Sequence, residues 1–146
     1  MKRLTCIALS LLMAMSLGST KAKSVKPATL TVDYVVSAYV DAIAHGKIKN
    51  IADVFTDDLK YSMVRGSVTK VYGKADVLEY FNNLKDVEQD CVVKVSVNDK
   101  TPDVVIAKVS MKFPTFTRTN YVTMVNSGKG WRITNVYSDF KESGKR

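Results

Sequence analysis

The chain has 146 residues, a formal net charge of +8 and a hydrophobic fraction of 46%. This length allows one domain with a sizeable core. The basic residues are scattered along the sequence rather than gathered with aromatic residues into a stripe, so we expect no nucleic-acid partner.

The first 22 residues have the three parts of a secretory signal peptide. Two basic residues open the chain, a mostly apolar run follows up to residue 17, and small residues lead to Ala22. The apolar run is too short to cross a bilayer comfortably. We therefore expect a signal peptide at 1–22, a flexible spacer at 23–30, and a periplasmic or secreted mature protein without a membrane span. An uncleaved membrane anchor is the alternative.

Cysteine and histidine are too scarce for several kinds of site. Cys6 lies inside the predicted signal peptide, so Cys91 is alone in the remainder of the chain. This excludes an intrachain disulfide and a thiolate zinc site. The one histidine, His45, and the dispersed carboxylates do not supply a set of metal ligands. We expect no metal and no other cofactor.

The first predicted element after the spacer is an amphipathic helix. Apolar residues recur at three- and four-residue spacing over 32–43, which indicates one buried helical face. Thr29 or Thr31 can cap the start of this helix. Gly46 can end it, because glycine readily adopts the left-handed conformation of a C-cap.

Shorter elements follow in the first half of the chain. A second helix is predicted over 48–55 and a turn over 56–58. A hairpin of two strands, 59–64 and 67–72, turns at an Arg-Gly pair. A third helix is predicted over 74–84, where apolar residues again repeat at helical spacing.

Four later segments alternate apolar and polar residues, which is typical of strands with one buried and one solvated face. They are 91–97, 105–113, 121–126 and 131–137. Helices that are segregated from a run of strands indicate an α+β fold. We expect a strongly curved antiparallel sheet covered by three helices from the N-terminal half, with a cavity at its open end.

Three segments resemble the nuclear transport factor 2-like superfamily, which includes ketosteroid isomerase, scytalone dehydratase and SnoaL-type polyketide cyclases. They are residues 39–58, with a Phe-x-Asp-Asp ending, residues 72–81, and residues 130–138. The resemblance implies a cone-shaped, cystatin-like domain over 31–141. We expect a disordered tail over 142–146. Among exported members, the chain is most similar to proteins grouped as "putative lumazine-binding".

The resemblance also allows a test for catalysis. An isomerase of this superfamily needs a carboxylate base and two hydrogen-bond donors for the developing oxyanion. The base position corresponds to Met63, which cannot accept a proton, and the donor positions to Tyr39 and Thr119. A dehydratase would use a histidine, but His45 lies at a predicted helix end. We therefore expect no catalytic residue, with a displaced base in an isomerase, cyclase or dehydratase as the alternative.

The predicted cavity has many apolar and aromatic residues and few hydrogen-bonding groups, which suits a small, flat, partly apolar ligand. By the family resemblance, that ligand is similar to lumazine or a pterin. The residues expected to form walls or to orient the ligand are Tyr39, Tyr61, Met63, Phe113, Tyr121, Thr123, Asn135 and Tyr137. Two alternatives stay open: these residues simply fill the core, or the domain is an interaction module that forms a homodimer through the outer face of the sheet.

Overall fold

The computed structural model describes residues 30–144; the predicted signal peptide, spacer residues 23–29 and residues 145–146 lie outside the described residues. The described chain contains two α-helices, one short 3-10 helix and six strands. In chain order they are α1 (Val32–His45), η1 (Ile51–Val54), β1 (Phe55–Arg65), β2 (Val68–Tyr72), α2 (Lys74–Asn83), β3 (Val92–Lys100), β4 (Val104–Lys112), β5 (Phe116–Asn126) and β6 (Trp131–Glu142).

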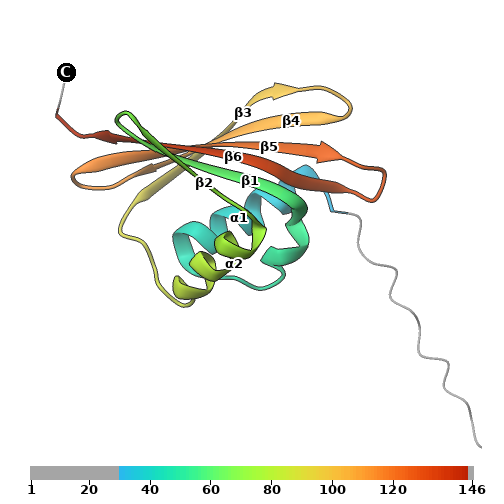
Figure 1. Cartoon of the computed structure of the whole chain (residues 1–146), viewed down its shortest axis with the longest axis horizontal. Helices are drawn as coiled ribbons and strands as arrows, with labels where there is room; N and C mark the ends of the chain where they lie inside the picture. Colours follow the sequence, from blue (N-terminus) through green and yellow to red (C-terminus); the bar gives the residue numbers. More distant parts are fainter. Residues whose placement is uncertain (1–29, 145–146) are drawn as a thin grey trace, which may run out of the picture.

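The strands form one sheet in the order β2-β1-β6-β5-β4-β3. Both helices lie on one face of it, which we call the inner face (Figure 1). Neighbouring strands are antiparallel except β1 and β6, which are parallel. The prediction of a wholly antiparallel sheet is therefore wrong, because β1 lies beside β6 and runs in the same direction. The α+β class is confirmed.

The prediction of three helices is also wrong, because the segment 48–55 forms only the four-residue η1. The chain is already extended at Phe55, which pairs with Ile133 of β6. The predicted turn at 56–58 belongs to β1, where the pairing register shifts between Phe55 and Lys60. Strand pairing thus takes residues that the sequence pattern assigned to a helix and a turn.

Both predicted caps of α1 are present. The Thr31 hydroxyl accepts a hydrogen bond from the Tyr34 backbone nitrogen at 3.2 Å, and Gly46 has a φ of 63°. A Cβ at Gly46 would lie 2.4 Å from the Leu84 carbonyl oxygen, so only glycine fits there. The Gly46 carbonyl accepts from the Asp86 nitrogen at 3.0 Å, which fixes the segment after α2 across the end of α1.

The core fills one end of the space between the helices and the inner face, and we call this region the packed end. The Phe81 ring from α2 meets Tyr39 of α1 edge-on at 6.1 Å and stacks on Phe55 of β1 at 6.0 Å. All three side chains are at most 1% exposed. The other members of the packed end are apolar residues of α1, η1 and the strands, among them Val35, Ile43, Val54, Val105, Val109, Met124 and Ile133.

Residues 142–144 of the predicted disordered tail are among the described residues. Strand β6 continues to Glu142, one residue beyond the predicted domain boundary, and the Ser143 nitrogen donates to the Thr115 carbonyl at 2.8 Å.

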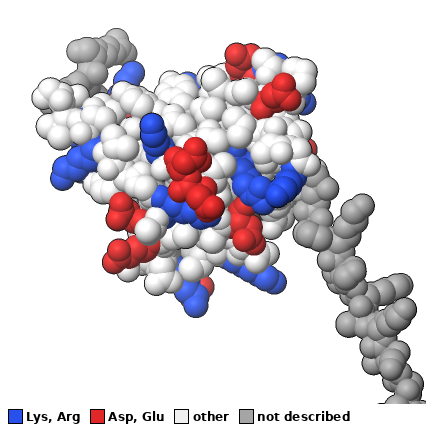
Figure 2. Space-filling view, turned by 45° about the vertical axis from the view of Figure 1, so that its right-hand side comes forward, with Lys and Arg blue, Asp and Glu red and all other residues white. Residues whose placement is uncertain are grey.

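Acidic and basic side chains are intermixed on the face that Figure 2 shows. Within residues 30–144, no helix has the length and apolar character that a bilayer crossing requires.

Candidate functional site

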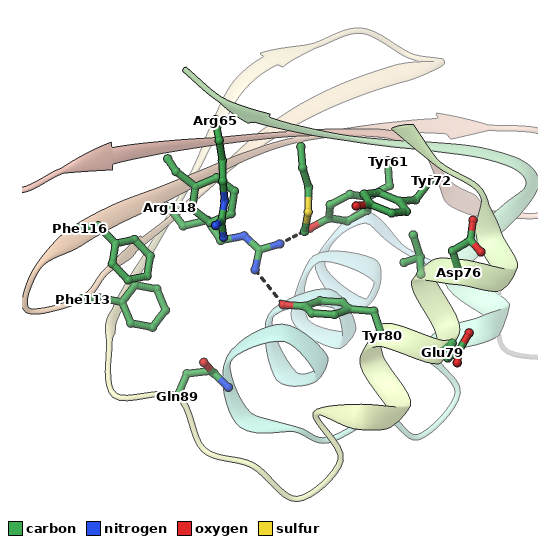
Figure 3. A pocket seen from close by; sticks show the side chains of 13 residues that line it. Tyr61, Arg65, Tyr72, Asp76, Glu79, Tyr80, Gln89, Phe113, Phe116 and Arg118 are labelled. Carbon is green, nitrogen blue, oxygen red and sulfur yellow. Dashed lines mark hydrogen bonds between the residues drawn. The ribbon is translucent and has the colours of Figure 1, made fainter. Parts of the chain in front are cut away.

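A cavity of about 610 Å³ opens between α2 and the inner face of the sheet, beside the packed end (Figure 3). This volume is in the usual range for small-molecule sites. Strands β1, β2, β5 and β6, helix α2 and the segments flanking β3 and β4 contribute to it. Its lining residues are Tyr61, Met63, Arg65, Tyr72, Asp76, Val77, Glu79, Tyr80, Gln89, Phe113, Phe116, Arg118 and Phe140.

The most unusual group in this pocket is the guanidinium of Arg118, a side chain that is only 6% exposed. Arg118 lies on β5, and strand alternation puts it on the inner face together with Asn120. Its Nε donates to the Asn120 Oδ1 at 3.2 Å and to the Ser138 Oγ at 3.0 Å. The Ser138 hydroxyl in turn donates to the Asn120 Oδ1 at 2.7 Å. Neighbouring strands therefore hold the buried side chain in place.

Tyrosine hydroxyls meet the other end of the guanidinium. Nη2 of Arg118 donates to the Tyr61 hydroxyl at 2.7 Å, and Nη1 donates to the Tyr80 hydroxyl at 3.1 Å (Figure 3). The Tyr61 hydroxyl also shares a hydrogen bond of 3.0 Å with the hydroxyl of Tyr39. The chain of contacts thus joins α1, β1, β5 and α2 around one cation.

Arg118 carries its charge without a carboxylate partner within the described residues. The ion pairs that join residues in the range 30–144 involve His45, Lys47 and Lys74, and none includes Arg118. Burial alone would lower the pKa of the Arg118 guanidinium, but the three tyrosine oxygens favour the charged form and raise this pKa above its ordinary range. The pocket therefore contains a permanent positive charge surrounded by neutral oxygens.

Aromatic rings form the wall beside this cation. The Phe140 ring centroid lies 5.3 Å from Cζ of Arg118 and 4.6 Å from Cζ of Arg65. Phe113 and Phe116 stack at 4.4 Å on the side of the pocket opposite α2 (Figure 3). These rings offer flat apolar surface close to the charge.

Four of the predicted ligand-binding residues belong to this region. Tyr61, Met63 and Phe113 line the pocket. Tyr39 does not line it, because its side chain is fully buried behind Tyr61, where its hydroxyl contacts the Tyr61 hydroxyl. Tyr39 supports the pocket from the packed end.

The other four predicted residues lie on the outer face of the sheet and do not line the pocket. They are Tyr121, Thr123, Asn135 and Tyr137. Tyr121 and Tyr137 are direct neighbours on β5 and β6 and are 36% and 43% exposed. The expectation assumed that aromatic residues face inward, but β5 turns Arg118 and Asn120 inward and its tyrosine outward. The expected homodimer through this outer face stays a prediction.

The positions considered for catalysis are also dispersed. Met63 lines the pocket, whereas Thr119 lies on the outer face opposite Asp139. His45 lies at the end of α1, where its Nδ1 contacts the Glu88 carboxylate. Asp76 and Glu79 of α2 line the pocket, but both are exposed. Among residues 30–144, no three His, Cys, Asp or Glu side chains are grouped as a metal ion would need.

The predicted site residues did not include Arg118, Tyr80, Phe140 and Arg65, which surround the polar part of the pocket. One signal for Arg118 was present in the sequence. Arg118 and Asn120 have the same parity as the apolar Val122 and Met124, so a continuous strand would put all four on one face. Polar residues at two such positions are a reason to suspect a site.

The fold and the pocket define a nuclear transport factor 2-like domain. A nuclear transport factor 2-like protein of unknown function from Silicibacter pomeroyi is 15% identical, with a TM-score of 0.62 over 75% of this chain and 92% of that one. A second from Shewanella baltica is 12% identical, with a TM-score of 0.60 over 75% and 90%. A ketosteroid isomerase-like protein from Erwinia carotovora atroseptica is 14% identical, with a TM-score of 0.56 over 75% and 92%.

The family of the chain is shown by a match to a family model over most of its length. The model of the family described as "Putative lumazine-binding" matches residues 28–138, so the chain belongs to this family. No curated protein matches the chain. The structural likenesses establish the fold, and together with the family match they confirm the expected superfamily.

Proposed function

We propose that this protein, after export, binds a small, flat, partly apolar molecule in the pocket on the inner face of the sheet. The observation that carries the proposal is the combination of a 610 Å³ cavity, stacked aromatic walls and one buried cation. The family description supports lumazine or a pterin as the first ligands to test. Such bicyclic rings could lie against Phe113 and Phe116.

The described residues favour binding over proton transfer. The side chain at the base position is Met63, which has no proton-accepting group. Of the two carboxylates that line the pocket, Asp76 already accepts a hydrogen bond from the Gly73 nitrogen at 3.3 Å as part of the start of α2. Glu79 is exposed. An isomerase with a displaced base would have to use one of these two groups.

Isothermal titration calorimetry with lumazine, a pterin and a steroid tests the binding proposal. We expect saturable binding of at least one flat heterocycle by the purified protein. Met63→Trp should abolish it, because the indole would occupy the pocket. Val64→Trp is the matched control, since the adjacent residue faces the other side of β1. No saturable binding, or equal loss in both variants, would contradict the proposal.

Export is tested separately by expressing the full chain in a Gram-negative host and sequencing the N-terminus of the purified product. We expect the protein in the periplasmic fraction, with a new N-terminus after Ala22 or near Ser19. Cytoplasmic protein that begins at Met1 would exclude this part of the proposal.

A further inference from the structure

We propose that the pocket selects ligands that carry an oxyanion of the carboxylate type, and that Arg118 binds this group. The inference rests on the proposed function, because it requires that the pocket holds a small molecule. It adds the chemical class of the ligand. The preference for an oxyanion follows from the hydrogen-bond donors and acceptors that face the pocket.

Arg118 has donors that the protein does not use. A guanidinium has five N–H groups, one on Nε and two on each terminal nitrogen. The Nε hydrogen is shared between Asn120 and Ser138, and each terminal nitrogen makes one hydrogen bond to a tyrosine. Within the described residues, one N–H on Nη1 and one on Nη2 therefore remain for a ligand.

The two tyrosines add further donors. The Tyr80 oxygen accepts from Arg118, and its own proton has no acceptor among the described residues. For Tyr61, the hydrogen bond with Tyr39 could run in either direction. If Tyr61 were the donor, the proton of the fully buried Tyr39 would have no acceptor, which is costly. Tyr61 is only 1% exposed as well, but it lines the pocket, where a ligand can accept its proton, so Tyr39 is the favoured donor.

The acceptors near the cation are already occupied. The Asn120 Oδ1 accepts from both Arg118 and Ser138, and the Ser138 oxygen accepts from Arg118. Asp76 and Glu79 lie on the α2 side of the pocket, away from the guanidinium (Figure 3). The polar part of the pocket thus offers donors and a positive charge, which a carboxylate oxygen complements better than a neutral or cationic group.

A second cation strengthens the preference for an anion. Arg65 also lines the pocket, and both guanidinium groups lie against the Phe140 ring. Arg65 is exposed, so it can attract an anion from solvent before Arg118 binds it in the interior. The flat body of the ligand would then lie between the Phe113–Phe116 wall and Tyr80.

The test compares two probes of the same shape, 2-naphthoate and its neutral amide, by isothermal titration calorimetry at pH 7. We expect the wild-type protein to bind 2-naphthoate at least tenfold more tightly than the amide, about the effect of one charge-assisted hydrogen bond. Arg118→Gln should remove this preference, and Arg118→Lys should keep part of it. Arg132→Gln, which changes an arginine of β6 that does not line the pocket, is the matched control and should change nothing.

The outcomes separate the two proposals. Equal affinity for the two probes in the wild type overturns the anion inference without depending on any variant. The same holds if neither probe binds while a neutral heterocycle still binds in a Met63→Trp-sensitive manner, and the proposed function then survives. If no compound binds at all, both proposals fail. Circular dichroism of each variant shows whether a loss of affinity reflects unfolding.

Discussion

The two ends of the space between the helices and the sheet are built from the same strands but differ in character. At the packed end, β5 contributes Val122 and Met124, which are at most 1% exposed and belong to the apolar core. At the pocket, the same face of β5 contributes Arg118, whose Nε donates to the fully buried Asn120. The short stretch of β5 from Arg118 to Val122 therefore leads from a charged cavity to a dry core.

This difference indicates that stability and binding are located in separate regions. The packed end gains free energy by removing apolar side chains from water. The pocket keeps a buried cation that has no carboxylate partner among residues 30–144, which lowers stability unless a ligand compensates the charge. Tyr39 connects the two regions, since its ring belongs to the core and its hydroxyl contacts Tyr61.

The largest expected effect is the loss of an aromatic ring from the packed end. Phe81 is fully buried and contacts both Tyr39 and Phe55, so Phe81→Ala should lower the free energy of unfolding by about 4 kcal/mol. Phe113→Ala, which removes the same ring from the half-buried pocket wall, should cost about 1 kcal/mol. Urea denaturation followed by circular dichroism measures both.

Similar losses in these two variants would show that the pocket wall belongs to the cooperative core, and the separation would then be wrong. Tyr34→Phe on the exposed side of α1 serves as a baseline for a change that should leave stability unaltered.

The packed end was largely predictable from the sequence, and the reason is physical. The helix over 32–45 repeats its apolar residues with the helical period, and its caps at Thr31 and Gly46 have local conformational preferences. Alternation likewise indicated the buried face of β4. Where local preference and burial agree, the sequence alone identifies the element.

The pocket was less predictable, because there the two criteria disagree. Arg118 and Asn120 face inward although polar residues usually face solvent, and Tyr121 and Tyr137 face outward although aromatic residues usually face the core. The parity of Arg118 with Val122 indicates the inner face, but whether an inner residue lies in a cavity or in the core depends on what packs over it from α2 and the other strands, and local sequence does not encode that. Departures of this kind are expected at functional sites.

Replacing the pocket cation should have a smaller and opposite effect on stability. Arg118→Met removes a buried charge while keeping a long side chain, and the Ser138–Asn120 and Tyr39–Tyr61 hydrogen bonds remain possible. We expect the free energy of unfolding to rise by about 1 kcal/mol in the absence of ligand. Urea denaturation measures it, and a loss of about 2 kcal/mol or more would mean that Arg118 is primarily structural.

The smallest effect concerns the connection between the two ends and appears only in alkali. Burial, followed by the proximity of Tyr61, holds the pKa of Tyr39 well above its ordinary value of 10.0. The unfolded chain releases the Tyr39 proton near pH 10, whereas the folded chain keeps it. Stability from this group is therefore complete below pH 10 and is lost as the pH rises through the folded-state pKa.

Tyr39→Phe should flatten this decline. The free energy of unfolding of the wild type should fall more steeply above pH 10 than that of the variant, by at most about 1.4 kcal/mol per pH unit. Urea denaturation at pH values about half a unit apart, from about 9 to about 11, measures the slope. Tyr34→Phe on the exposed side of α1 is the matched control. Equal slopes in the wild type and Tyr39→Phe would mean that the Tyr39 hydroxyl is open to solvent, and the boundary between the dry core and the pocket would then lie deeper than the hydrogen bond to Tyr61.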